Sequence, residues 1–137
     1  MRLIKLSQAD KEMRTRADVI SFFNGVLRQK SRLGEFGLTK GKSKMAGIHR
    51  GTLLLFSYKA ECMFIARAAS EIIPDSDPEH PAYFVIDVDS IAKAKSSLHE
   101  YEQALKKRGL LKKNLVRGQA WPELSEECEA FTLSYFK

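Results

Sequence analysis

The sequence predicts a single α+β domain in which α-helices surround a short β-sheet. Apolar residues recur at every third or fourth position over residues 13–27 and 98–105, which is typical of helices. Short apolar runs over residues 52–58 and 82–88 are typical of strands. Residues 1–137 suit one domain, because domains most often contain about 100–150 residues. A composition of 44% hydrophobic and 29% charged residues argues against a disordered chain.

The first predicted elements are a short strand over residues 2–6 and a helix that runs to about Gln29. Ser7 and Asp10 have the spacing of a capping box, in which two side chains satisfy the first free amides of a helix. The apolar positions of this helix form one stripe that we expect to be buried. They are Met13, Ala17, Ile20, Phe23 and Leu27.

Residues 30–51 are predicted to form one long loop, because the periodicity stops there and five glycines appear. Loops of about twenty residues are uncommon in compact domains and are usually functional or disordered. Glu35 is the single acid of this segment, against six basic residues. These are Lys30, Arg32, Lys40, Lys42, Lys44 and Arg50. Glycine lets backbone approach a ligand closely and basic side chains reach phosphates, so we expect this loop to contact a ligand.

Three apolar segments predict the core of the sheet. Residues 52–58 have the pattern of a strand buried on both faces. Residues 62–69 form its partner across a tight connection at residues 59–61. Residues 82–88 alternate between two faces and are predicted to form a third strand.

The last third of the chain is predicted to begin with a helix that starts at Ser90 or Ser97 and ends near Lys107. Residues 115–119 fit a further strand. Leu124, Cys128, Phe131 and Tyr135 follow helical spacing, but residues 131–136 also alternate as a strand does, so two alternatives remain open for the final element.

Basic residues outnumber acidic ones by 23 to 17, which gives a net charge of +6. A positive excess favours phosphate-rich partners through counterion release, although it also fits two merely solvated basic surfaces. A second basic group covers residues 106–117, whereas acids concentrate at residues 75–79 and 123–129. No apolar run approaches the roughly 18–20 residues of a membrane-spanning helix, and no secretion signal is recognisable. We therefore expect a soluble cytoplasmic protein with no membrane partner.

Metal and cofactor chemistry is not predicted. Cys62 and Cys128 lie among apolar residues without zinc or redox spacing, which predicts two buried free thiols. Asp87 and Asp89 point to one face of their strand, as a metal or acid–base pair would, but no third ligand is near in the sequence.

Catalytic motifs are also missing. Neither Gly-x-Ser-x-Gly nor His-Glu-x-x-His occurs, and His49, His80 and His99 are scattered along the chain. The sequence therefore favours binding over catalysis.

Aromatic and amide side chains suited to nucleic acid occur in the strands and in the tail. They are Phe56, Tyr58, Tyr83, Gln119 and Trp121. Aromatic faces stack on bases, an amide reads a base edge, and basic residues hold phosphates. Most aromatic residues of a small domain belong to its core, so Trp121, which precedes Pro122 in a polar segment, is the best candidate for a binding site.

Four segments between about residues 50 and 121 share the order and content of a known family. They are Gly51-Thr52-Leu53-Leu54-Leu55-Phe56-Ser57-Tyr58-Lys59, Ile65-Ala66-Arg67-Ala68, His80-Pro81-Ala82-Tyr83-Phe84-Val85-Ile86-Asp87-Val88 and Arg117-Gly118-Gln119-Ala120-Trp121. Together they resemble the PUA-like superfamily, particularly its EVE and ASCH-type branches and the similar domains found beside HNH nucleases. This chain departs from the family in having Thr52 where an acidic residue often follows the first glycine.

The resemblance implies a small, mixed, partly closed β-barrel flanked by helices, which recognises RNA or modified DNA in a pocket beside a loop. It implies that Tyr58, Lys59, Gln119 and Trp121 lie near that pocket, with Arg50 at its edge. The predicted nucleic-acid-binding residues are these five together with three lysines of the basic segment. Those lysines are Lys40, Lys42 and Lys44.

The first hypothesis is therefore a nucleic-acid-binding module that recognises RNA or a modified base. One alternative is a small nuclease or hydrolase acting on RNA or a nucleoside-like ligand, with Asp87, His49, Lys59 and Tyr58 as the first candidates for catalysis. Another is a regulatory subunit whose basic faces contact an acidic protein partner.

Overall fold

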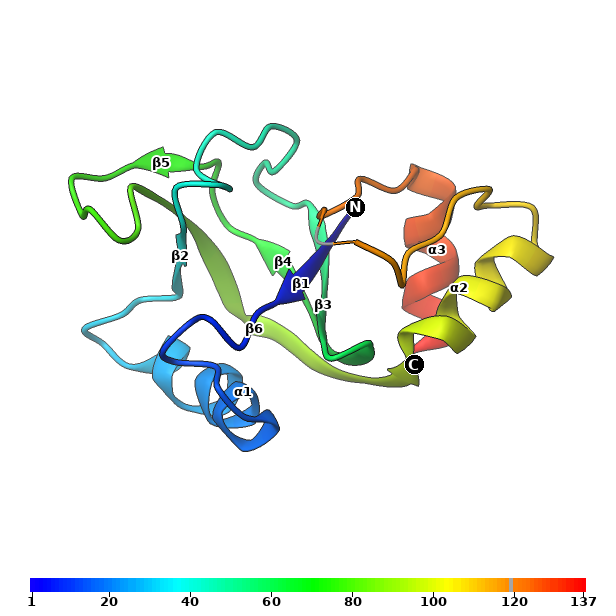
Figure 1. The fold of residues 1–137 in the computed structure, drawn as a ribbon, viewed down its shortest axis with the longest axis horizontal. Helices are drawn as coiled ribbons and strands as arrows, with labels where there is room; N and C mark the ends of the chain where they lie inside the picture. Colours follow the sequence, from blue (N-terminus) through cyan, green and yellow to red (C-terminus); the bar gives the residue numbers. More distant parts are fainter. Residues whose placement is uncertain (119) are drawn as a thin grey trace.

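The computed structural model, which describes residues 1–118 and 120–137, has a mixed α+β architecture built on one curled, six-stranded sheet (Figure 1). The strands are β1 (Arg2–Leu6), β2 (Glu35–Leu38), β3 (Leu53–Tyr58), β4 (Glu61–Ala68), β5 (Ile73–Pro74) and β6 (Ala82–Ser97). The helices are α1 (Arg16–Asn24), the 3₁₀-helix η1 (Val26–Arg28), α2 (Leu98–Lys107) and α3 (Glu126–Tyr135). The predicted α+β class is confirmed.

The strand order is β1-β3-β4-β6-β2, and β5 pairs with β6 beside this path. β1 runs parallel to β3, while every other pairing between named strands in the described chain is antiparallel. β6 has 16 residues, so its first part pairs with β2 and β5 and its later part with β4. The tight β3–β4 hairpin agrees with the predicted pairing of residues 52–58 and 62–69.

Irregularities in the β4–β6 pairing curl the sheet. Arg67 lies opposite Asp87, but Ile65 lies opposite Ala92, so β6 carries extra residues between these pairs. Ser90 fills the bulge, because its hydroxyl accepts a hydrogen bond from the Arg67 amide (2.7 Å) and donates one to the Asp87 carbonyl (2.6 Å). Bulges bend a strand and increase its twist, and here the strands form a half-barrel.

The sheet has a hydrophobic cluster on each face. In β3 all six side chains are buried: Leu54 and Phe56 face a cluster that includes α1, and Leu53 and Leu55 face a cluster that includes α2 and α3. Figure 1 shows α1 on one side of the sheet and the α2–α3 pair on the other. The prediction that this strand is buried on both faces is confirmed.

The first helix begins later than predicted. Its capping box is formed by Thr15 and Asp18, whose side chains each accept a hydrogen bond from the other's backbone amide at 3.1 Å. Ser7 instead accepts from the Ala9 amide and Asp10 from the Glu12 amide, so both residues close short turns. The predicted start at residue 7 is wrong because these side chains bond to backbone two residues ahead, which competes with helix formation.

The predicted loop over residues 30–51 is interrupted by β2, where Phe36 and Leu38 are buried and Phe36 lies opposite Phe84. The irregular segment that remains between β2 and β3, residues 39–52, is called the basic loop below. Gly34, just before β2, and Gly37, within it, interrupt the apolar pattern, so the sequence does not predict this strand.

The C-terminal elements also depart from the predictions in part. β6 continues to Ser97, which caps α2 by accepting from the Glu100 amide at 3.0 Å, and this decides between the two predicted helix starts. Residues 115–118 are irregular, so the predicted strand is wrong over that described range. The final element is a helix, α3, capped by Ser125.

Both cysteines are buried free thiols, as predicted. Burial raises the pKa of Cys62 to about 12, so this thiol stays protonated at neutral pH. Within residues 1–118 and 120–137, no helix is both long enough and apolar enough to cross a membrane.

Candidate functional site

An irregular segment before α3 runs along the outer edge of β1, and we call residues 115–118 and 120–124 the strap. The Leu3 amide donates to the Pro122 carbonyl at 3.0 Å, and the Leu124 amide donates to the Met1 carbonyl at 2.8 Å. Since β1 is an edge strand, these bonds satisfy backbone groups that would otherwise face water.

A buried carboxylate of α2 holds the start of the strap. One oxygen of Glu102 accepts hydrogen bonds from the Leu115 and Val116 amides. Burial alone raises the pKa of Glu102, but these two bonds, together with the nearby Lys106 and His99, outweigh it and leave the pKa below its usual value. A charged carboxylate therefore fixes the strap to α2.

Lys5 fixes the next part of the strap. Its ammonium donates to the carbonyls of Arg117 (3.3 Å) and Gly118 (3.0 Å). Burial lowers the pKa of Lys5, Glu102 opposes that shift, and the positive charge of Lys42 adds to it. Lys5 and Lys42 are thus close enough for their like charges to repel each other.

Trp121 lies where the strap meets the basic loop. Its half-buried ring packs against the cluster on the α1 side of the sheet, and its indole N–H donates to the Lys5 carbonyl at 3.2 Å. The ammonium of Lys42 lies over the ring, 5.0 Å from its centroid, in a cation–π contact. The structure therefore brings together two of the predicted site residues, Trp121 and Lys42.

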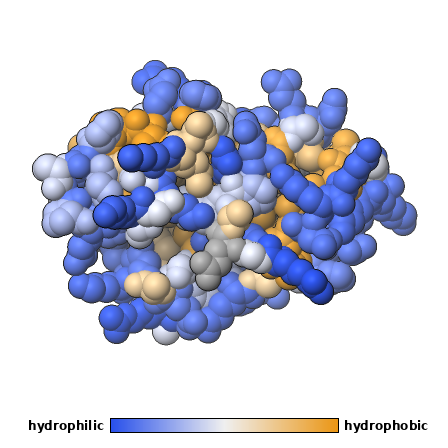
Figure 2. All heavy atoms as spheres, turned by 45° about the horizontal axis from the view of Figure 1, so that its top comes forward, coloured by the Kyte–Doolittle hydropathy of each residue, from blue (hydrophilic) through white to orange (hydrophobic). Residues whose placement is uncertain are grey.

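Short turns and apolar contacts with the core shape the basic loop. The Lys42 amide donates to the Thr39 carbonyl (2.9 Å), and the Ser43 hydroxyl donates to the Lys40 carbonyl (3.0 Å). Ile48 is buried in the core and holds the far end of the loop. Lys40 and Lys44 are exposed, as is Arg50 near the start of β3. In Figure 2, which brings the top of Figure 1 forward, hydrophilic side chains cover most of this face.

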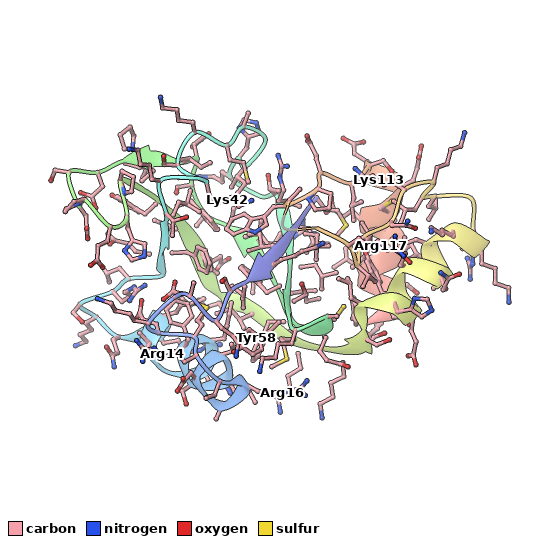
Figure 3. All side chains as sticks on the ribbon, in the orientation of Figure 1. Arg14, Arg16, Lys42, Tyr58, Lys113 and Arg117 are labelled. Carbon is pink, nitrogen blue, oxygen red and sulfur yellow. The ribbon has the colours of Figure 1, made fainter. Side chains whose placement is uncertain are left out.

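Tyr58 does not share this site. Its side chain is 1% exposed, belongs to the core cluster on the α1 side, and carries a hydroxyl for which the described part of the chain offers no hydrogen-bond partner. Lys59 is exposed in the β3–β4 turn, with its ammonium 5.7 Å from the Tyr58 ring centroid. Arg50 lies just before β3, at the opposite end of that strand from Lys59. Figure 3 shows Tyr58 near α1 and Lys42 well away from this helix. Gln119 lies outside the described residues.

Two basic residues of β1, Arg2 and Lys5, belong to the site but were not predicted. The guanidinium of Arg2 donates to the Trp121 carbonyl at 2.8 Å and also to the Ala46 carbonyl, and it lies 3.8 Å from a Glu123 oxygen. The signal in the sequence is two cations inside a five-residue strand that is otherwise apolar.

A separate open hollow of about 260 Å³ lies between the end of α2 and the start of α3 and contains none of the predicted site residues. Its lining is mostly apolar. It is formed by Leu110, Leu111, Lys112, Lys113, Glu123, Leu124, Ser125 and Cys128.

Within the described ranges, no three His, Cys, Asp or Glu side chains are grouped so as to hold a metal ion. The region around Trp121 offers positive charge and an aromatic ring, which suit binding to an anionic aromatic ligand. No model of a known protein family, curated protein or solved structure matches the chain.

Proposed function

We propose that this protein is a nucleic-acid-binding module of the PUA-like type, which holds phosphates with the basic loop and an unpaired base of RNA or modified DNA on Trp121. The observation that carries the proposal is the position of the Lys42 ammonium over the Trp121 ring, 5.0 Å from its centroid. This places an aromatic ring and a loop cation, from segments far apart in the sequence, in direct contact. The half-barrel flanked by helices supports the PUA-like assignment.

A base can compete with Lys42 for the indole. Lys42 is half-buried, and a cation–π contact is worth about 0.5–1 kcal/mol at an exposed site and about 2 kcal/mol when it is desolvated. Stacking of a base on an aromatic side chain is worth about 1–3 kcal/mol. The two contacts are therefore of similar size, so a base can take the place of the Lys42 ammonium on the ring when phosphate contacts of the basic loop add to the stacking.

The charges around the ring suit a polyanion. Lys40 and Lys44 are exposed on the same loop as Lys42. Glu123, the acid of the strap, lies 3.8 Å from the Arg2 guanidinium, so it forms an ion pair with a cation of β1. A phosphate backbone that follows the loop meets ammonium groups and displaces their condensed counterions.

The test is the salt dependence of binding to short fluorescent oligonucleotides, measured by anisotropy with single-stranded RNA, single-stranded DNA and duplexes. We expect affinity for single strands to fall as salt rises from about 50 to about 200 mM. In a Lys40→Ala/Lys42→Ala/Lys44→Ala variant, the slope of log K against log salt should be shallower by about 0.7 for each lysine that contacts a phosphate.

The matched control is Lys93→Ala/Lys95→Ala/Lys107→Ala, which removes the same charge from exposed residues of β6 and α2. This control should keep the wild-type slope. A wild-type affinity that is flat with salt, or equal losses in both triple variants, would show that the basic loop is not a phosphate-binding surface.

A further inference from the structure

Arg2 is a buried cation at the junction of the two segments that form the candidate site. It is 9% exposed, and its guanidinium donates to the Ala46 carbonyl of the basic loop and to the Trp121 carbonyl of the strap. It also lies 3.8 Å from the Glu123 carboxylate, which is a second contact with the strap. One side chain of the edge strand thus holds both segments.

The loop backbone is adapted to this guanidinium. Gly47 has a φ of +90°, a conformation that residues with a Cβ rarely adopt. A Cβ at Gly47 would lie 2.5 Å from the Arg2 Nη2 atom and 3.3 Å from a Glu123 oxygen. The backbone conformation at this position therefore favours glycine, and the guanidinium of Arg2 would have to move to admit a Cβ.

We infer that Arg2 is a positioning residue that couples the basic loop to Trp121, so that the contacts of Lys42 depend on Arg2 although Arg2 need not touch the ligand. The inference takes its ligand, a nucleic acid, from the proposed function. The contacts of Arg2 on which it is based do not depend on that function. A guanidinium is a planar fork that donates in two fixed directions, so it can hold two carbonyls from different segments at once. A lysine at this position keeps the charge but lacks the fork.

A double-mutant cycle tests the coupling. Lys42→Met is made in the wild type and in an Arg2→Lys background, and two readouts are taken: affinity for single-stranded RNA and emission of Trp121, which is the only tryptophan of the chain. In the wild type, Lys42→Met should change the emission and weaken binding. In the Arg2→Lys background both effects should shrink, so that the two substitutions deviate from additivity by about three-fold or more in affinity.

Lys44→Met is the matched control, because Lys44 is an exposed lysine of the same loop, and its effects should be similar in both backgrounds. Gly47→Ala disturbs the same junction without changing any charge, because it strains the loop backbone at φ +90° and places a methyl group against the guanidinium. It should reproduce the effect of Arg2→Lys on the Lys42→Met emission change. Circular dichroism and thermal unfolding identify which variants are folded.

The emission readout separates the two proposals, since it needs no ligand. If the wild type binds no oligonucleotide but the emission cycle is non-additive, the proposed function fails and the role of Arg2 stands. If Lys42→Met changes the emission equally in both backgrounds and in Gly47→Ala, Arg2 does not position the loop and the inference is rejected, whatever the oligonucleotides do.

Discussion

Tyr58 and Trp121 show how differently the chain uses two aromatic residues that the sequence singles out. Tyr58 ends a strand with six buried side chains, so its ring is part of the core. Trp121 lies in an irregular segment, where no strand neighbours cover the whole ring, and it stays half-buried. Exposure therefore follows from the backbone around each residue and not from the residue type.

Substitutions at Tyr58 test its assignment to the core. Its buried hydroxyl has no hydrogen-bond partner in the described chain, and such a group costs about 1–3 kcal/mol. Tyr58→Phe should therefore leave the free energy of unfolding unchanged or raise it by about 1 kcal/mol, whereas Tyr58→Ala should lower it by about 3–5 kcal/mol through the cavity it creates. Urea unfolding measures both.

Binding measurements on Tyr58→Phe complete this test. Because the ring is retained and the hydroxyl is buried, oligonucleotide affinity should match the wild type. A folded, equally stable Tyr58→Phe protein with clearly weaker binding would mean that the hydroxyl reaches the ligand after all.

At the residue scale, only part of the candidate site is predictable from the sequence. Lys42 and Trp121 are recognisable because Lys42 lies in a glycine-rich basic loop and Trp121 precedes a proline in a polar segment. Arg2 and Lys5 are not recognisable, because their roles arise from the strap lying along β1, a contact between the two ends of the chain. Local patterns carry no information about such a contact.

At the scale of elements, α1 shows two competing capping signals within one stretch of chain. Ser7 with Asp10 and Thr15 with Asp18 share the same spacing, but only the second pair forms the reciprocal bonds of a capping box. The sequence alone does not choose between them. In the structure the Ser7 and Asp10 side chains bond to amides two residues ahead, and Val19 of α1 is buried in the core.

Alanine substitutions at the two candidate caps distinguish the alternatives. Thr15→Ala should lower the free energy of unfolding by about 1 kcal/mol, because the Asp18 amide loses its acceptor at the start of α1. Ser7→Ala, the matched control, removes a hydroxyl from an exposed turn and should change stability by less than about 0.5 kcal/mol. Urea midpoints that rank the two variants in the opposite order would place the helix start near residue 7.

Strands were predictable where apolar runs are continuous and less so where they are interrupted. β3 and β4 follow from continuous apolar runs joined by a short turn. β2 has only Phe36 and Leu38 as buried apolar residues, and β6 continues through a bulge into a polar half that no apolar pattern marks. Pairing with neighbouring strands, and not local propensity, determines these elements.

At the scale of the whole molecule, the curled sheet provides a scaffold with a helix-covered core on each face. The edge of β1 is where the basic loop and the strap meet, held by Arg2, Lys5 and Glu102. The candidate site therefore lies on irregular segments fixed to a rigid edge, an arrangement in which binding residues often occur. Its two halves come from opposite parts of the chain, so the site exists only in the folded molecule.

The central claim is that Trp121 and the basic loop bind one nucleic acid together, and the fluorescence of Trp121 tests it most directly. Titration with single-stranded RNA should quench the emission in a saturable way, since a base stacks on the ring. The quenching should disappear or require much more RNA in the Lys40→Ala/Lys42→Ala/Lys44→Ala variant and persist in the Lys93→Ala/Lys95→Ala/Lys107→Ala control. Emission that stays unchanged while anisotropy reports bound RNA would contradict the claim.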